Sequence, residues 1–282
     1  MSGRPGRDPW TGGAAYDAYM GRWSRLVAAQ FVRWLGVAPG GCWIVVGCGT
    51  GALTAEVLAA GDPARVTGVD PSPEQIARAR ASVVDRRARF EVGDAEARVL
   101  PGASADAVVS GLVLNFLADP AAAIARMAAL SKPGGVVAGY VWDYAGEMGM
   151  LRAFWEAAVA LDPAAAELDE GRRFPDAHPG ALGAMFRSAG LARVETRAIE
   201  ITMDFSDFDD LWRPFLGGQG PAPGYVASLD DGARRRLRER LERELTRPGT
   251  RGIRLTARAW AARGRTPAPS PVSPPRPAPT QG

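Results

Sequence analysis

Short apolar runs and amphipathic stretches alternate along the first half of the chain. The apolar runs predict buried strands, and the apolar positions at helical spacing between them predict helices. The predicted strands are 44–46, 65–69, 88–92, 106–110 and 136–142. The predicted helices are 16–35, 52–60, 73–84 and 120–130. This alternation is typical of a parallel sheet with right-handed crossovers and helices on both faces.

The rhythm changes after residue 142. Residues 151–161 and 179–189 have helical spacing and flank a predicted loop at 162–178. Helices and a Gly/Pro-rich loop are predicted within 207–246. Two late segments, 192–205 and 252–261, alternate apolar and polar residues as half-buried strands do. The second half therefore combines helical insertions with a late pair of strands.

The run from Trp43 to Gly51 carries the most informative chemistry. Its apolar residues predict a strand, glycines follow at 47, 49 and 51, and a helix is predicted from Ala52. Glycine permits positive φ and leaves no side chain between the backbone and a ligand. A helix N-terminus adds unpaired N–H donors. A strand, a glycine turn and a helix in this order indicate a site for a nucleotide-like ligand.

Two kinds of enzyme use such a turn. Gly47, Gly49 and Ala52 fit the G-x-G-x-x-G/A form of dinucleotide enzymes, whereas Gly47, Gly49 and Gly51 fit G-x-G-x-G. Asp70 ends the second predicted strand, where a carboxylate can accept hydrogen bonds from both hydroxyls of a ribose. Asp94 follows the third strand, where a carboxylate can accept from the exocyclic amine of adenine.

In this order the motifs resemble those of the class I S-adenosylmethionine (SAM) methyltransferases of the small-molecule type, over about residues 40–145. The resemblance implies an α/β fold with a Rossmann-like, doubly wound, mostly parallel sheet. The late strands would form its C-terminal antiparallel pair, and insertions near 144–190 and 206–250 would cap the strand ends. It also implies SAM as cofactor and a small-molecule acceptor methylated at O, N or C. The cofactor-binding residues that it implies are Tyr19, Arg22, Gly47, Cys48, Gly49, Gly51, Asp70, Pro71, Asp94, Ala95 and Leu112.

One position departs from the family pattern. Val45 stands two residues before the first glycine, where the family usually has an acid that helps to anchor the methionine end of SAM. Losing such a polar interaction typically costs on the order of 1–3 kcal/mol. A relative that binds the cofactor weakly or no longer methylates is therefore one alternative. An NAD(P)-dependent oxidoreductase is another, although Lys132, the only lysine, lacks the tyrosine four positions earlier that a short-chain dehydrogenase needs.

The catalytic chemistry leaves a short list of side chains. Methyl transfer from a sulfonium needs orientation above all, and it needs a general base only if the acceptor must lose a proton. The candidates for such a base are Asp143, at the end of the fifth predicted strand, and His178, the only histidine. Ser110-Gly111-Leu112-Val113 stands in place of an N/D-P-P-Y motif, which argues against methylation of nucleobase amines.

Composition indicates which partners, location and metal sites to expect. A net charge of +3, from 34 basic and 31 acidic residues, does not favour a nucleic-acid partner. No apolar run predicts a membrane span or a signal peptide, so we expect a cytoplasmic location. The two cysteines form no cluster with metal-ligand spacing, and we expect no metal site. We expect a mobile start at 1–13, one domain at 14–263 and a disordered proline-rich tail at 264–282, with the oligomeric state left open.

Overall fold

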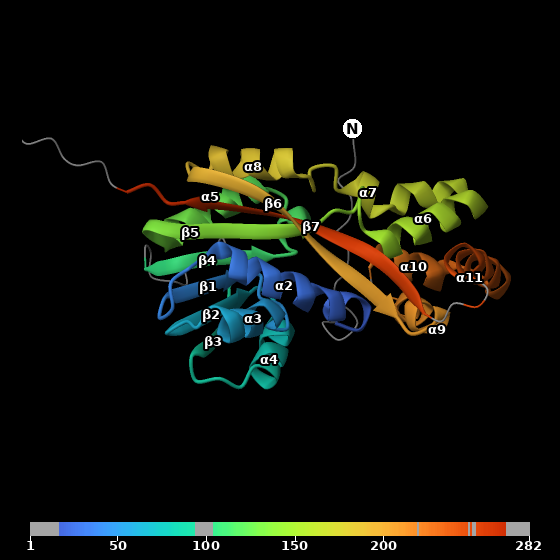
Figure 1. Cartoon of the computed structure of the whole chain (residues 1–282), viewed down its shortest axis with the longest axis horizontal. Coiled ribbons are helices and arrows are strands. Elements are labelled where there is room, and N and C mark those ends of the chain that lie inside the picture. The colour runs from blue at the N-terminus through green and yellow to red at the C-terminus, as the bar shows by residue number, and fades with distance from the viewer. Residues whose placement is uncertain (1–16, 94–103, 219, 248, 250–251, 269–282) are drawn as a thin grey trace, which may run out of the picture.

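The computed structural model describes residues 17–93, 104–218, 220–247, 249 and 252–268, and it contains one seven-stranded sheet (Figure 1). The strands are β1 (Cys42–Val46), β2 (Arg65–Asp70), β3 (Ala88–Val92), β4 (Ala105–Gly111), β5 (Ser131–Trp142), β6 (Ala192–Phe205) and β7 (Ile253–Arg265). Their order across the sheet is β3-β2-β1-β4-β5-β7-β6. The strands from β3 to β5 pair in parallel, and β7 runs antiparallel to both of its neighbours. The predicted fold class is confirmed.

Helices cover both faces of this sheet. On one face, α2 (Arg22–Leu35) packs against α3 (Ala52–Ala60), close to α4 (Pro73–Ser82) (Figure 1). On the other face, α5 (Pro120–Leu130) packs against α8 (Pro179–Ser188). The buried residues of α2 include Val27, Phe31 and Leu35, which recur at helical spacing. The arrangement matches the three layers that the alternating pattern predicted.

Two of these helices begin at a capping side chain followed by proline. The Ser72 hydroxyl accepts a hydrogen bond from the Gln75 backbone N–H, and Pro73 occupies the first position of α4. Asp119 and Pro120 start α5 in the same way. Strand β5 begins earlier than the predicted residue 136, because Ser131 pairs with Ala105 across a register shift.

A group of short helices lies beyond the carboxyl ends of the parallel strands (Figure 1). We call this group the cap. Its elements are α6 (Gly149–Leu161), η3 (Pro163–Leu168), α7 (Glu170–Arg173), α9 (Phe208–Trp212), η4 (Arg213–Gly217), α10 (Pro221–Ser228) and α11 (Asp231–Leu245). The prediction of a loop throughout 162–178 is wrong. Asp162 and Asp169 accept bonds from the backbone N–H groups of Ala164 and Gly171, and so begin two short helical segments there.

The long β6–β7 hairpin connects the sheet to the cap (Figure 1). Its pairing runs from Ala192–Arg265 to Phe205–Ile253, with a bulge near Arg193, where φ is +51°. Strand β7 continues to Arg265, so Gly264 and Arg265 belong to the sheet rather than to the predicted tail. Residues 1–13, expected to be mobile, and 269–282 of the expected tail lie outside the described residues. Among the described residues, no helix is long and apolar enough to cross a membrane.

Candidate active site

The glycine turn joins the end of β1 to the start of α3. Gly47, Gly49 and Gly51 all have positive φ, at +66°, +52° and +92°. The backbone N–H groups of Gly47 and Cys48 both donate to the Val69 carbonyl, at 2.8 and 3.0 Å, which ties the turn to the end of β2. The turn is therefore a fixed left-handed loop at the carboxyl edge of the sheet, where open α/β sheets bind ligands.

The three glycines are required for different reasons. A Cβ atom on Gly47 would lie 2.6 Å from a methyl carbon of Val113, and one on Gly51 would lie 2.9 Å from a methyl carbon of Val83. These two glycines allow close packing within the protein. A Cβ atom on Gly49 would meet nothing within 4 Å. The space beside Gly49 is therefore open, as a backbone cradle for a ligand requires.

Asp70 lies beside this turn at the end of β2. One of its carboxylate oxygens accepts from the Gly49 N–H at 3.0 Å and the other accepts from the Ser72 N–H at 2.9 Å. These two bonds fix the plane of a half-buried carboxylate whose remaining lone pairs can accept from a ligand. The structure thus brings Asp70 and the glycine turn together, as the resemblance implied.

Val45 fills the position of the missing acid with an apolar side chain. It is 0% exposed and pairs with Gly68 and Val109 on the neighbouring strands. Two buried hydroxyls stand near the ends of the elements that meet at the turn, on Thr54 in the first turn of α3 and on Ser110 near the end of β4. Neither has a hydrogen-bond partner among the described residues. Two hydroxyl groups are therefore available for hydrogen bonds at this edge of the sheet, although the acid is absent.

The other residues of the implied cofactor site differ in where they lie. Leu112 follows β4 with φ of +60° and donates its backbone N–H to the Tyr140 carbonyl at 2.8 Å. Pro71 is exposed beyond the end of β2. Burial, with a smaller effect of Asp70, raises the pKa of the Cys48 thiol to about 12, so the thiol stays neutral at physiological pH. Asp94 and Ala95 lie outside the described residues.

Tyr19 and Arg22, the two N-terminal residues that the resemblance implies in cofactor binding, lie in different surroundings. Tyr19, in the π-helical turn η1 (Asp17–Gly21), is buried, and its ring lies 5.7 Å from that of Phe215 in the cap. Arg22 turns toward the end of β6, where it pairs with Asp210 at 3.3 Å and lies over the ring of Trp23. Arg22 therefore joins the start of α2 to α9 of the cap.

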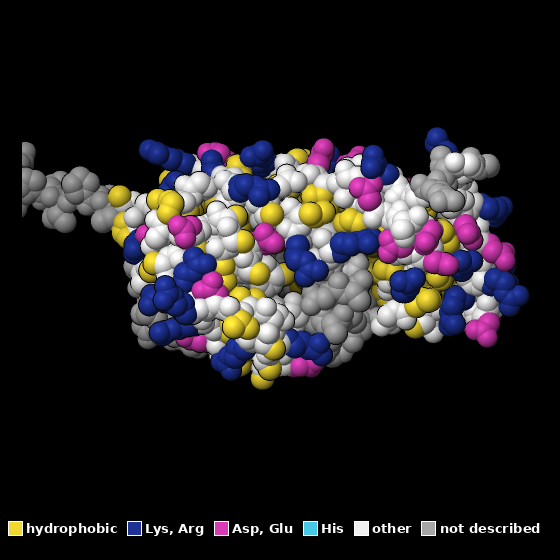
Figure 2. All heavy atoms as spheres, turned by 60° about the horizontal axis from the view of Figure 1, so that its bottom comes forward, with side chains coloured by type: hydrophobic (Ala, Val, Ile, Leu, Met, Phe, Trp, Pro, Cys, Tyr) yellow, Lys and Arg dark blue, Asp and Glu magenta, His cyan; other side chains and the backbone are white. Residues whose placement is uncertain are grey.

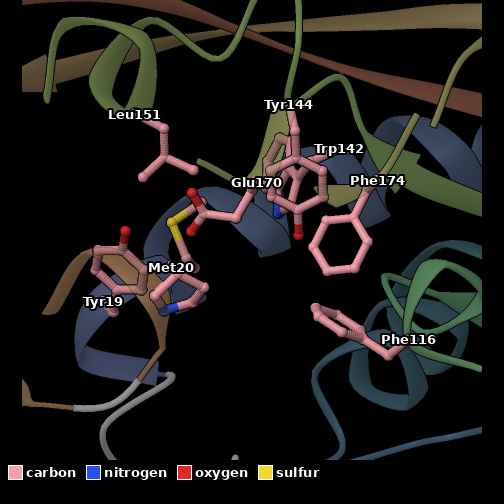
Figure 3. Close-up of a pocket in the computed structure, with 9 residues that line it drawn as sticks. Tyr19, Met20, Phe116, Trp142, Tyr144, Leu151, Glu170 and Phe174 are labelled. Atoms are coloured by element: carbon pink, nitrogen blue, oxygen red, sulfur yellow. The ribbon is translucent and has the colours of Figure 1, made fainter. Parts of the chain in front are cut away.

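An aromatic cavity lies where β5, η1 and the cap meet (Figure 3). We call it the aromatic pocket. It is lined by Tyr19, Met20, Phe116, Trp142, Tyr144, Leu151, Glu170, Phe174 and Pro221. Phe174 lies between Tyr144 and Phe116, at 5.2 Å from each ring. Phe116 belongs to the 3-10 turn that follows β4, so the pocket borders the segment that also carries Leu112.

Glu170 is the one acidic side chain among the described residues that line the aromatic pocket, and the sequence did not predict it as a site residue. Its side chain is 3% exposed and its carboxylate accepts a hydrogen bond from the indole N–H of Trp155. The pKa of Glu170 is raised to about 7, mainly by burial and to a smaller extent by nearby Asp169, while the hydrogen bonds to the carboxylate and the charge of Arg173 act to lower it. The available signal was Asp169 as a helix cap before Glu170, but only the tertiary structure shows that this helix faces a cavity.

The two residues proposed as a general base have other surroundings. Asp143 is buried, accepts from the backbone N–H groups of Gly146 and Glu147, and pairs with Arg258 at 2.7 Å. His178 is exposed, and its Nδ1 caps α8 by accepting from the Ala181 N–H. Neither side chain lines the aromatic pocket. Their contacts are those of residues that stabilise a turn and a helix end.

The charges of the described surface are mixed. On the face shown in Figure 2, basic and acidic side chains alternate over the sheet domain and the cap. Among the described residues, no group of three or more His, Cys, Asp or Glu side chains could hold a metal ion.

Comparison with known proteins places this geometry in a family context. A sequence model described as "Methyltransferase domain" matches residues 44–139, which hold β1 to β5 and the glycine turn. Trans-aconitate 2-methyltransferase from Methylobacterium radiotolerans is 36% identical over 130 residues, covering 44% of this chain and 48% of that protein. An uncharacterised methyltransferase from Mycobacterium tuberculosis is 33% identical over 130 residues, covering 46% of this chain and 59% of that protein. The chain thus spans about half the length of the curated relatives that it matches.

Solved structures resemble a larger part of the chain. Phosphoethanolamine N-methyltransferase 2 from Haemonchus contortus, in complex with S-adenosyl-L-methionine, has a TM-score of 0.55 at 17% identity and covers 91% of this chain and 57% of its own. A protein assigned as a Type II methyltransferase from Anaeromyxobacter dehalogenans has a TM-score of 0.59 at 22% identity, over 86% of this chain and 97% of its own. At these identities the likeness establishes the fold.

Proposed function

We propose that this chain is a SAM-dependent methyltransferase of a small-molecule acceptor, because residues 44–139 match a methyltransferase-domain model and lie within a Rossmann-like sheet. The observation that supports it best is the open cradle at Gly49 beside the oriented carboxylate of Asp70. Both lie at the carboxyl edge of the sheet, the edge at which Trp142 ends β5 and lines the pocket that would hold an acceptor.

The residues present fit the proposed cofactor. The backbone at Gly47 and Gly49 would approach its methionine part, and Asp70 would accept from its ribose hydroxyls. The buried hydroxyls of Thr54 and Ser110 supply polar atoms at an edge from which the usual acid is missing. We also propose that Cys48, Gly51, Pro71 and Leu112 bind the cofactor as neighbours of the cradle. Asp94 and Ala95 would bind its adenine. Arg22 is left out because its guanidinium is held by the Asp210 carboxylate.

The aromatic pocket provides the acceptor site. When bound, SAM would supply an electrophilic methyl group, so the task of the protein is to orient the acceptor and to exclude water. Trp142 and Tyr144 extend from the end of β5, while Leu151, Glu170 and Phe174 approach from the cap (Figure 3). The indole N–H of Trp142 is buried without a partner among the described residues, and it can donate to an oxygen of the acceptor.

Calorimetry tests the cofactor assignment. Titration with S-adenosylhomocysteine (SAH) and with NADH separates the two classes of nucleotide enzyme, and we expect binding of SAH alone. Asp70→Ala should weaken SAH binding at least tenfold. Asp230→Ala is the matched control, because Asp230 also accepts from a backbone N–H, at the start of α11. Binding of NADH without SAH, or equal SAH affinity in Asp70→Ala and the parent protein, would overturn the proposal.

A further inference from the structure

Among the described residues that line it, the aromatic pocket has one carboxylate and no basic side chain. All nine lining residues are described, and none is lysine, arginine or histidine. In Figure 3 the carboxyl group of Glu170 points toward Met20, and Phe174 and Phe116 lie on the other side of the pocket. A negatively charged acceptor would therefore meet a buried carboxylate here, with no basic side chain among the described lining residues.

Glu170 has no ion-pair partner among the described residues, although arginines lie nearby. Arg152 is held by Asp169 through two hydrogen bonds. Arg173 lies with its guanidinium carbon 5.7 Å from the ring centre of Phe174, and its effect on Glu170 is smaller than that of burial. The side-chain donor to the Glu170 carboxylate among the described residues is the indole N–H of Trp155. A buried carboxylate in this state favours a ligand that carries positive charge.

The rings around Glu170 favour the same kind of ligand. Tyr19, Phe116, Trp142, Tyr144 and Phe174 approach the cavity from η1, from the segments after β4 and β5, and from the segment after α7. The face of an aromatic ring attracts a cation within about 6 Å of its centre, and the attraction grows where water is excluded. Aromatic rings around one buried carboxylate are thus suited to an ammonium group and poorly suited to an anion.

We propose that the acceptor of this methyltransferase is an amine, bound as its ammonium ion in the aromatic pocket with Glu170 as counter-ion and proton acceptor. This inference rests on the function proposed above. Before the nitrogen can accept a methyl group it must lose one proton. In that step the N–H bond breaks, an O–H bond forms at the Glu170 carboxylate, and the electron pair stays on nitrogen. The proton passes to water when the product leaves.

A series of ligands that differ in charge tests the proposal. The full-length protein, saturated with SAH, is titrated calorimetrically with benzylamine, benzyl alcohol and benzoate. These compounds share a ring and carry charges of about +1, 0 and −1 at neutral pH. We expect benzylamine to bind at least tenfold more tightly than benzyl alcohol, and benzoate to bind most weakly. In Glu170→Gln the amide oxygen can still accept from Trp155, and we expect benzylamine to lose its advantage.

Two measurements keep the outcomes distinct. Glu167→Gln, an exposed change in the same part of the cap, should behave like the parent protein. SAH affinity should be unchanged in both variants, because Glu170 belongs to the acceptor pocket. Loss of SAH binding in the parent protein would overturn the methyltransferase assignment itself. SAH binding together with a preference for benzoate, with no binding of any of the three compounds, or with undiminished selectivity in Glu170→Gln would overturn the amine proposal alone.

Discussion

Alanine at Gly49 should separate ligand binding from folding at the glycine turn. The φ of Gly49 is +52°, and a Cβ atom there would meet no protein atom within 4 Å. Alanine in the left-handed region costs roughly 1–2 kcal/mol, which corresponds to a fall in melting temperature of about 2–8 °C for a chain of this size. The added methyl group would project into the space that we assign to the cofactor. We therefore expect a folded protein with at least tenfold weaker SAH binding.

Gly40→Ala is the matched control for the backbone strain. Gly40 has φ of +77°, has no atom within 4 Å of its Cβ position, and precedes β1 at the opposite edge of the sheet. Both variants should lose similar stability in thermal denaturation, but only Gly49→Ala should lose SAH affinity in calorimetry. Gly47→Ala should unfold at a lower temperature than either, because its Cβ would lie 2.6 Å from Val113. Normal SAH binding by Gly49→Ala would refute the assignment of the cradle.

Three further predictions concern buried groups. Arg258→Met should lower the free energy of unfolding by about 3 kcal/mol in urea titrations, because it leaves the buried Asp143 carboxylate without its cation. The control is Arg254→Met, which breaks the exposed ion pair between Arg254 and Asp204 and should lower the free energy of unfolding by under about 1 kcal/mol. The pKa of Glu170 is raised from 4.5 to about 7, so the folded protein binds more protons than the unfolded chain between these values and loses stability as pH rises through that window. Glu170→Gln should abolish this loss, of roughly 3 kcal/mol, and an unchanged pH profile of unfolding would contradict the burial of the carboxylate. Val45→Asp should destabilise the protein by at least about 2 kcal/mol without tightening SAH binding, because residue 45 is 0% exposed and the new carboxylate would be buried. Tighter SAH binding in calorimetry would contradict this, since it would mean that an acid at position 45 can still anchor the cofactor.

Much of the sheet and its flanking helices could be predicted from the sequence. Helices 52–60 and 120–130 and strand 88–92 have the predicted bounds, because their boundaries carry local signals such as the glycine turn and the Asp119-Pro120 cap. The glycine turn and Asp70 could also be predicted to meet, since the carboxyl ends of adjacent parallel strands share one edge. These features depend on interactions between residues close in sequence, or on the general geometry of parallel sheets.

The acceptor site depended on contacts between distant segments. Glu170 was placed in a predicted loop, and nothing in its local sequence shows that α6 buries it or that Tyr19 and Trp142 lie across the same cavity. Conversely, Asp143 ends a strand at the expected edge, but Arg258 on β7 engages it, which the sequence around Asp143 does not reveal. The sequence by itself determined the strand–turn–helix cradle, because glycine and strand patterns act locally. Only the tertiary structure decided which carboxylate faces a cavity and which is held by an arginine, because burial and pairing depend on residues far apart in the chain.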